Sequence, residues 1–578
     1  MRSDRLPGNL AAAGPGSRNA SAWKKRRNKK PKTTVDIPTK PANFREIRKW
    51  IYLISMVGML AQLAISQTPE NVFAAMVCAG GNSFVAFSFF RPKNLKNFPL
   101  SSWMVLLFAL SNFTVPLLMK TAEFEPLDYN LKFPYLTFGY ALATQLALIA
   151  GHWLYSNSQT VTRLRNRITY KVLQPLGMFK TPNEFQMWIM GFIGTAAHAV
   201  VISRPDLNEA GSPLVKACNA LIPFTYAPFL MPFAFLVSDK IDKPAKSSKL
   251  IPLYFAFTVV IALAANGRGG LIIPLVTLLM CWMLGYFSNR LPSSFRQKRL
   301  VVITALAVAI LMPIISNIAL AMAVARHERT TSSPVQLIQQ TIKDYGDTKA
   351  INQVILDAQS DSTWDETYVH NPLLARFVNT KYHDNGFNDT HSLNGGDRDE
   401  YVAFLKQKSV DLLPAPVILQ LGMKSDKNDQ AGSGADFLHR LNTGAALGGF
   451  RTGSIVASGV FLYGIFYLPV VGIASIFMFL AADSFCAIRR RRSVQPGVEG
   501  STEQIRFIVV FSPAILLMVW QCVYNNFEFE AVTDWIGVLF RIMPVQVLFY
   551  FVIIKLTSLV SFQSSFADTS LKKPVGVA

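Results

Sequence analysis

Hydrophobic residues occur along this chain in long runs that are separated by short polar segments. A membrane-spanning helix needs about 20 consecutive, mostly apolar residues. Runs that meet or approach this length predict twelve spans, at residues 51–65, 72–90, 101–119, 134–155, 185–202, 214–237, 251–265, 271–287, 300–325, 454–485, 507–524 and 538–556. The pattern therefore predicts an all-α polytopic membrane protein with about 12 transmembrane helices.

One long polar segment, residues 326–450, interrupts this series. Apolar residues recur at helical spacing within residues 334–358, and residues 397–407 suggest a further short helix. Residues 361–394 are aromatic and polar, which favours irregular structure there. We expect one large, mostly helical domain on one side of the membrane.

The chain is thereby expected to have five parts. They are a disordered basic tail (residues 1–48), the first nine spans (49–325), the large loop domain (326–450), a re-entrant segment with the last three spans (451–557), and a cytoplasmic tail (558–578). The tenth apolar run is long for a single span. Residues 454–463 are interpreted as a short re-entrant helix, and residues 466–485 as the span itself.

Composition agrees with a membrane protein and changes the interpretation of its charge. The 578 residues are 51% hydrophobic and 16% charged, whereas soluble proteins carry about 25% charged residues. The net charge of +22 first suggests nucleic acid as a partner. Most basic residues, however, lie in the N-terminal tail and in short loops between spans, which is the positive-inside pattern of membrane proteins.

This charge pattern predicts the orientation. With the N-terminus in the cytoplasm, every strongly basic loop lies inside, and the acidic loops at residues 121–133 and 526–534 lie outside. Residues 326–449 carry 12 lysines and arginines against 16 aspartates and glutamates, a net charge of −4, and also fall outside. The predicted location is the bacterial inner (cytoplasmic) membrane, with both termini cytoplasmic and the large loop in the periplasm.

Arginines gather at this outer face, where the positive-inside pattern leaves few. They are Arg268, Arg326, Arg329, Arg376, Arg451 and Arg541. Arg268 lies between glycines, which let a backbone approach a ligand closely, and a guanidinium binds two phosphate oxygens at once. The cluster predicts an anionic ligand such as a lipid diphosphate. The alternatives are that Arg268 reaches up to lipid headgroups and that Arg541 pairs with Asp534 or Glu530.

Histidines in the large loop are candidate acid–base groups. His439 follows Asp436 by nearly one helical turn, so His439 is a candidate general base that the carboxylate would orient. A packing or solvent-exposed role is the alternative. His383, His391 and Asp389 form a second cluster with no recognisable metal-ligand spacing. All five cysteines lie in or beside apolar runs, so no metal site and no disulfide framework is predicted.

Three features together resemble the bacterial oligosaccharide repeat-unit (O-antigen, Wzy-type) polymerase and O-antigen ligase superfamily. They are the Arg268-Gly269-Gly270 segment that opens a span, the single large loop late in the chain, and the small-residue segment 453–472 with its aromatic-Gly turn. The likeness covers about residues 251–556. The acidic residue often found in that segment is replaced by Ala457 and Ser458, and the ligases' His-Asn pair is absent. Polymerase and ligase both stay open.

The resemblance implies a membrane-embedded glycosyltransferase that needs no metal or other cofactor. Its donor would be a glycan on undecaprenyl diphosphate, and its acceptor one repeat unit on the same lipid, for O-antigen, capsule or exopolysaccharide biosynthesis. Expected partners are the lipid-linked oligosaccharide, membrane lipids, a chain-length regulator and a flippase, with no nucleic acid. The arginines would stabilise the leaving diphosphate, and the loop would exclude water.

Two other classes of function fit a polytopic chain with this loop. One is a transporter or flippase of a lipid-linked or anionic solute, although the sequence has no internal repeat of the kind many transporters show. The other is a non-catalytic scaffold subunit of a polysaccharide export complex. A scaffold predicts that single arginine substitutions are silent, whereas a polymerase predicts that they stop chain extension.

Overall fold

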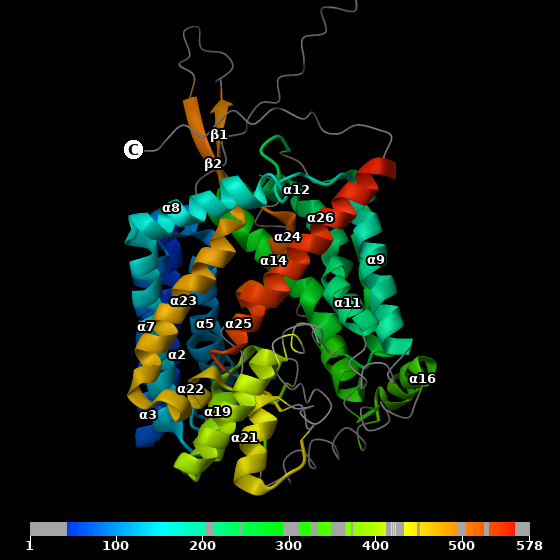
Figure 1. Cartoon of the computed structure of the whole chain (residues 1–578). Helices are drawn as coiled ribbons and strands as arrows, with labels where there is room; N and C mark the ends of the chain where they lie inside the picture. Colours follow the sequence, from blue (N-terminus) through cyan, green and yellow to red (C-terminus); the bar gives the residue numbers. More distant parts are fainter. Residues whose placement is uncertain are drawn as a thin grey trace, which may run out of the picture. The chain divides into compact units, whose positions relative to one another are not determined.

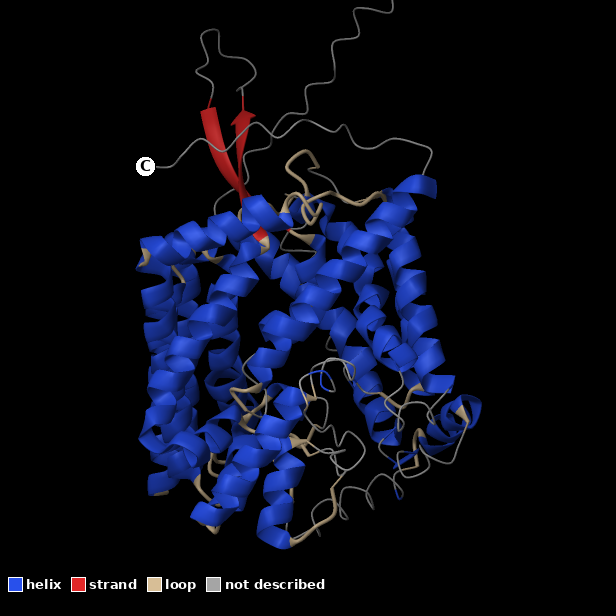
Figure 2. Ribbon diagram, in the orientation of Figure 1, coloured by secondary structure: helices blue, strands red, loops and turns tan. Residues whose placement is uncertain are grey.

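The structure is a computed structural model (Figure 1). It describes residues 43–203, 213–241, 245–267, 269–292, 313–322, 324–325, 333–347, 349, 364–371, 374–411, 418, 420, 422, 433–447, 451–493, 504–524 and 531–560. These residues are predominantly helical, as Figure 2 shows. Eight helical stretches among them are long and apolar enough to cross a membrane: Pro69–Phe89, Pro99–Ala122, Glu184–Ser203, Leu214–Val237, Lys246–Ala264, Gly269–Phe287, Ile455–Ser484 and Asp534–Leu559.

An all-α membrane architecture is thus confirmed, whereas the predicted number of twelve spans is not. Two further long helices, α2 (Phe44–Ile65) and α7 (Pro134–Asn157), coincide with the first and fourth predicted spans but are more polar. At 24 residues α7 is about 36 Å long, enough to cross the apolar core of a bilayer. Of the predicted ninth span, a helix at Pro313–Met322 lies within the described residues.

The predicted eleventh span, residues 507–524, is wrong as a single helix. Strand β2 (Gln504–Phe511) pairs with β1 (Cys486–Ser493), and α24 (Pro513–Leu517) and the π-helix η9 (Trp520–Tyr524) follow. The run Ile508-Val509-Val510-Phe511 is β-branched and aromatic, which suits a strand, and Pro513 occupies the first turn of a new helix. Every residue of α24 is buried.

A first group of helices surrounds the third predicted span. This span is composed of α5 (Pro99–Ala109), the π-helix η1 (Leu110–Thr114) and α6 (Val115–Ala122). The group also contains α2, α3 (Pro69–Phe89), α4 (Pro92–Asn97), α7, α8 (Gln159–Arg167), η2 (Ile168–Leu173) and α23 (Tyr467–Ser484). Of these, α2, α3, α4, α7 and α23 contact the span directly, and α8 and η2 contact α23. Buried Asp483 joins α23 to α5, because its carboxylate accepts the backbone N–H groups of Leu100 (3.0 Å) and Ser101 (3.2 Å).

Close contact between α7 and α23 depends on a glycine. A Cβ atom on Gly151 would lie 2.4 Å from the carbonyl oxygen of Gly472 and 2.6 Å from Ser475 Oγ. Small residues at such crossings let two membrane helices approach each other. Gly80 offers a contrast on α3, since a Cβ there would meet no atom within 4 Å.

We expect Gly151→Val to destabilise the protein by about 1–3 kcal/mol, because the added methyl groups have no space at the α7–α23 crossing. The measurement is thermal unfolding of the detergent-purified protein, with Gly80→Val as the matched control in another helix. Equal shifts for the two variants would contradict the close crossing.

A second group of helices is built around α9 (Glu184–Ser203) and η3 (Ile222–Phe233). Pro223, Pro228 and Pro232 explain the long 3₁₀ stretch of η3, since proline removes the N–H donors that an α-helix needs. The rest of the group lies at Pro213–Leu221 (α11), Ala234–Val237 (α12), Lys246–Leu250 (η4), Ile251–Ala264 (α13), Gly269–Phe287 (α14), Asp534–Gly537 (α25), Val538–Ile542 (η11) and Met543–Val560 (α26).

The large loop contributes short helices. They are α16 (Pro334–Asp344), η7 (Leu374–Phe377), α18 (Thr380–His391), α19 (Gly395–Val410) and α21 (Gly434–Thr443). Helices were expected where α16 and α19 lie, and both are confirmed. The expected irregular structure across residues 361–394 is wrong for α18. Stacked rings of Phe404 and Phe437, 4.2 Å apart, hold α19 against α21.

The predicted break in the tenth apolar run is confirmed. Helix α22 (Ile455–Tyr463) ends at Gly464, whose φ of +56° favours glycine, and η8 (Gly464–Phe466) leads into α23. Helix α22 packs against α18 rather than continuing the line of α23 as one rod. This elbow brings the start of α22 to the loop helices and so positions the site described next.

Candidate functional site

Helix α18 connects the loop to the membrane helices. The side chain of Asp384 is fully buried, and its carboxylate accepts the backbone N–H groups of Lys132 (2.9 Å) and Phe133 (2.7 Å) at the start of α7. A carboxylate at a helix N-terminus satisfies unpaired donors and interacts favourably with the helix dipole. At the beginning of α18, the N–H of Asn379 donates to the carbonyl oxygen of Ser111 (3.2 Å).

Ser111 lies in η1, well inside the third span. The span ends at Ala122, eleven residues later. At 1.5 Å per residue this separation is about 16 Å along the helix. Helix α18 therefore begins at the depth of the membrane helices and not above their ends. π-Helical turns of this kind are frequent at functional sites.

His383 joins three elements at this depth. Its Nε2 lies 2.7 Å from Asn112 Oδ1 in η1, and its Nδ1 lies 2.8 Å from Ser454 Oγ. Because an amide oxygen only accepts, Nε2–H donates to Asn112, and Nδ1 accepts the hydroxyl hydrogen of Ser454. Ser454 Oγ also accepts the N–H of Ala457 (2.9 Å), so it caps α22. The chain of bonds fixes the start of α22 relative to the third span.

Burial lowers the pKa of His383 to about 3, so the imidazole is neutral near pH 7. Its ordinary pKa is about 6.5. In the unfolded chain His383 therefore binds a proton below pH 6.5 that the folded chain does not bind. The contribution of neutral, buried His383 to the free energy of unfolding is therefore complete above pH 6.5 and is lost as the pH falls towards 3.

We expect wild type to lose about 2 kcal/mol more stability than His383→Gln when the pH falls from 7 to 5, at roughly 1.4 kcal/mol per unit below 6.5. Glutamine does not titrate, but it keeps one donor and one acceptor for Asn112 and Ser454. Unfolding midpoints of both proteins at several pH values check this. Parallel curves would show that His383 is not the buried neutral group.

A second histidine, His439 on α21, is oriented by a carboxylate. Its Nδ1 lies 3.0 Å from Asp389 Oδ1, and both side chains are buried. With Nδ1–H donated to Asp389, Nε2 carries the free lone pair. Nε2 is buried and has no hydrogen-bond partner among the residues that the structure describes. The group that orients His439 is thus Asp389 on α18, and the predicted pairing with Asp436 is wrong.

Asp436 has a different set of partners, because it lies at the first turn of α21. Its Oδ2 accepts the N–H of Ser433 (3.2 Å), and the Ser433 hydroxyl accepts the N–H of Asp436 (2.9 Å), which closes a capping box. Its Oδ1 accepts the N–H of Arg451 and also Nη1 of that arginine, each at 3.2 Å. Asp436 therefore holds Arg451 in place.

Trp364 lies against both groups. Its ring contacts His439 edge to face, with centroids 5.5 Å apart, and the guanidinium carbon of Arg451 lies 5.7 Å from the indole. The indole N–H donates to Glu366 (3.1 Å), which is paired with Arg376 (4.0 Å). Arg376 Nη1 in turn donates to Thr452 Oγ1 (3.3 Å). Arg376, Arg451, Asp436 and His439 thus belong to one connected group of side chains.

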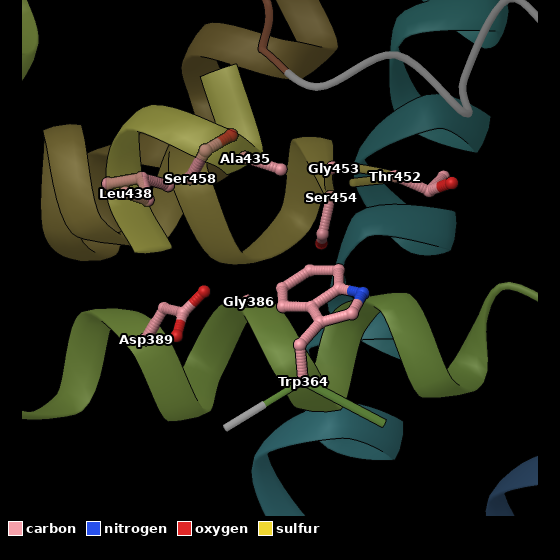
Figure 3. A pocket seen from close by; sticks show the side chains of 9 residues that line it. All are labelled: Trp364, Gly386, Asp389, Ala435, Leu438, Thr452, Gly453, Ser454 and Ser458. Atoms are coloured by element: carbon pink, nitrogen blue, oxygen red, sulfur yellow. The ribbon is translucent and has the colours of Figure 1, made fainter. Parts of the chain in front are cut away.

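A small pocket lies within this group (Figure 3). It is partly open to solvent and has room for about one water molecule. Figure 3 shows the Trp364 indole and the Asp389 carboxylate on α18's side, facing residues at the start of α22. The lining residues are Trp364, Gly386, Asp389, Ala435, Leu438, Thr452, Gly453, Ser454 and Ser458. Near the pocket, Arg451 Nε is a buried donor with no hydrogen-bond partner within the described part of the chain.

The remaining predicted arginines are not brought to this group by the described structure. Arg268, Arg326 and Arg329 lie outside the described residues. Arg541 is exposed in η11. The proposed pairing of Arg541 with Asp534 is wrong, because Asp534 pairs with Lys408 (3.9 Å). Glu530, the other suggested partner, is also outside the described residues.

The turn before Arg268 has a structural explanation. Asn266 adopts a left-handed φ of +43°, and the N–H groups of Asn266 and Gly267 donate to the carbonyls of Leu263 and Ala262. This pair of hydrogen bonds ends the helix, and asparagine is one of the residues that tolerate the left-handed backbone conformation. A Cβ on Gly270 would lie 2.7 Å from Ala262 Cβ, so that glycine also serves close packing of α13 and α14.

One group of potential metal ligands occurs among the described residues, at Glu123, Glu125 and His370. Both carboxylates also contact Lys120 Nζ. The two imidazole nitrogens face different carboxylates, Nδ1 at 3.4 Å from Glu123 and Nε2 at 3.6 Å from Glu125. One ligand atom from each of the three residues lies within 4.8 Å of the others, but the Lys120 ammonium already supplies positive charge to both carboxylates, so a cluster of ion pairs accounts for this group.

Comparisons with known protein families, with curated proteins and with solved structures give no match for this chain.

Proposed function

We propose that the protein is a membrane-embedded glycosyltransferase that polymerises oligosaccharide repeat units carried on undecaprenyl diphosphate. The observation that supports it best is the buried His439–Asp389 pair, which lies in one connected group with Arg451 and Arg376. Nε2 of His439 has no partner among the described residues. A base and two cations that contact the pocket-lining residues Asp389, Trp364 and Thr452 suit a reaction in which a hydroxyl loses a proton and an anionic group departs.

In the proposed reaction His439 Nε2 takes the proton of the acceptor sugar hydroxyl. The hydroxyl oxygen forms a bond to C1 of the donor glycan, and the bond from C1 to the diphosphate oxygen breaks. Its electron pair stays on undecaprenyl diphosphate, which leaves with increased negative charge. Arg451 and Arg376 would stabilise that charge, with Arg268, Arg326, Arg329 and Arg541 as further candidates.

The position of the site favours a lipid-linked substrate. Helix α18 begins about 16 Å inside the third span, so the substrate's reactive end would meet the site near the membrane. Basic α8 follows the end of α7 that is remote from Asp384. With α8 in the cytoplasm, the pocket belongs to the periplasmic side of an inner membrane. Proposed partners are the lipid-linked glycan and, in the cell, a flippase and a chain-length regulator.

The test is a deletion strain that carries either wild type or His439→Gln at matched membrane abundance. Surface glycans are separated on a gel. We expect the variant to retain single repeat units but to lose long chains, as the deletion does. His391→Gln is the matched control, because His391 is exposed at the end of α18.

Other results would favour the competing classes. Glycan chains of wild-type length from His439→Gln, together with loss of long glycan chains in the deletion strain, would indicate a scaffold. Repeat units that accumulate at the cytoplasmic face in the deletion strain would indicate a flippase. Either outcome would overturn the proposed polymerase.

A further inference from the structure

A basic and apolar stripe lies on α8 and η2, at the end of α7 remote from the site. Arg163, Arg167 and Lys171 follow one another at intervals of one helical turn, and all three are exposed. The structure gives none of them an ion-pair partner among the described residues, and residues 130–183 contain no aspartate or glutamate. Three uncompensated positive charges therefore line one side of this segment.

The opposite face of the same segment is firmly anchored. Buried Arg165 donates to the carbonyl of Asn97 (3.0 Å). Thr169 Oγ1 donates to the carbonyl of Ser484 (2.8 Å). Tyr170 OH donates to the carbonyl of Ile488 (3.1 Å). The stripe is thus presented outward on a fixed frame.

Apolar side chains accompany the exposed charges. Leu164 is 42% exposed, Val172 49% and Leu176 37%. Trp153, near the end of α7, is 64% exposed, and tryptophan favours the interface between a membrane and water. A helix with a buried face, an apolar face and a basic face matches the surface of a bilayer, where acyl chains lie beside phosphate headgroups.

We propose that α8 and η2 form a binding surface for anionic phospholipid, with Arg163, Arg167 and Lys171 on the headgroups and Leu164 and Val172 against the acyl chains. The surface is continuous with the membrane helices, since α8 follows α7 directly, and its charge complements an anionic leaflet. This surface is independent of the chemistry proposed for His439.

The test uses the full-length protein purified in detergent and stripped of lipid. Retention of dioleoyl-phosphatidylglycerol and of dioleoyl-phosphatidylcholine is measured by native mass spectrometry over a range of lipid concentrations. Wild type should bind phosphatidylglycerol more tightly. The variant Arg163→Gln/Arg167→Gln/Lys171→Gln should lose that affinity by about 10²-fold, since each basic residue at a membrane surface contributes roughly a factor of five.

The matched control is Arg398→Gln/Lys406→Gln/Arg440→Gln, which removes three exposed charges from the loop helices. It should bind phosphatidylglycerol as wild type does. Unfolding midpoints in lipid-free detergent should agree among the three proteins, which separates lost binding from lost structure. Equal losses in both triple variants, or equal retention of the two lipids by wild type, would overturn the proposal. Displacement of the lipid by an equal concentration of inorganic phosphate would also overturn it, because the acyl chains would then contribute nothing.

Discussion

Replacing Asp389 with asparagine is expected to reduce glycan chain extension by about 10²–10⁴-fold, which is the usual contribution of a positioned general base. Asp389 accepts Nδ1–H of His439 at 3.0 Å and so keeps the lone pair on Nε2. An amide can present an N–H to Nδ1 instead, and the imidazole would then carry its proton on Nε2. His439 would then be unable to take the proton of the acceptor sugar hydroxyl.

The measurement is glycan chain length in the deletion strain at matched membrane abundance. Asp399→Asn is the control, since Asp399 is exposed on α19 and the chemical change is the same. Wild-type chains from Asp389→Asn would remove the main support for His439 as the base. Asp436→Asn tests a different property, because that substitution weakens the hold on Arg451 without touching His439.

The largest loss of stability is expected from Lys120→Met, about 3 kcal/mol. The side chain of Lys120 is fully buried, and its ammonium contacts both Glu123 and Glu125. It also lies 4.2 Å from the Tyr129 ring and 4.8 Å from the Tyr368 ring. Removing one partner from a buried ion pair leaves uncompensated charge and costs about 3–5 kcal/mol. The two glutamates are only about one-fifth exposed, so solvent relieves little of this.

Lys49→Met is the matched control for Lys120→Met. Lys49 also pairs with a glutamate three residues away, Glu46, but both side chains are largely exposed. We expect a change within about 0.5 kcal/mol, as for most surface pairs. Unfolding midpoints in detergent check both. Similar midpoints for the two variants would mean that the Lys120 cluster is worth no more than a surface pair.

Apolar run length predicts much of the membrane part, because hydrocarbon demands long apolar helices that satisfy their own backbone groups. It fails where an apolar run is buried by protein rather than by lipid. Residues 507–524 are apolar enough for a span, but β-branched residues and Pro513 divide them into a strand and two short helices. Apolar character alone does not distinguish these two surroundings.

The candidate site was predicted in part. His439 and Arg451 were predicted separately, as a base and as a diphosphate ligand, and they lie in one group. The carboxylate that orients His439 comes from 50 residues away. The nearer Asp436 is engaged in capping α21, a common role for aspartate at that position. His383, Gly386 and Asp389 recur every three residues, so a helical interpretation of this stretch would have placed them on one face. Trp364 carries no sequence signal of its role, because its neighbours come from other elements.

The cap that Asp384 provides for α7 has a consequence for how the chain is made. The N–H groups of Lys132 and Phe133 have no Asp384 carboxylate to donate to until about 250 further residues have been synthesised. At about 5–20 residues per second, a ribosome needs roughly 13–50 s to reach Asp384. During that interval the beginning of α7 is inserted without its cap. A polypeptide truncated before Thr380 would therefore insert its early helices into the bilayer with the N-terminus of α7 uncapped. Cellular quality control would act on the protein in that uncapped state.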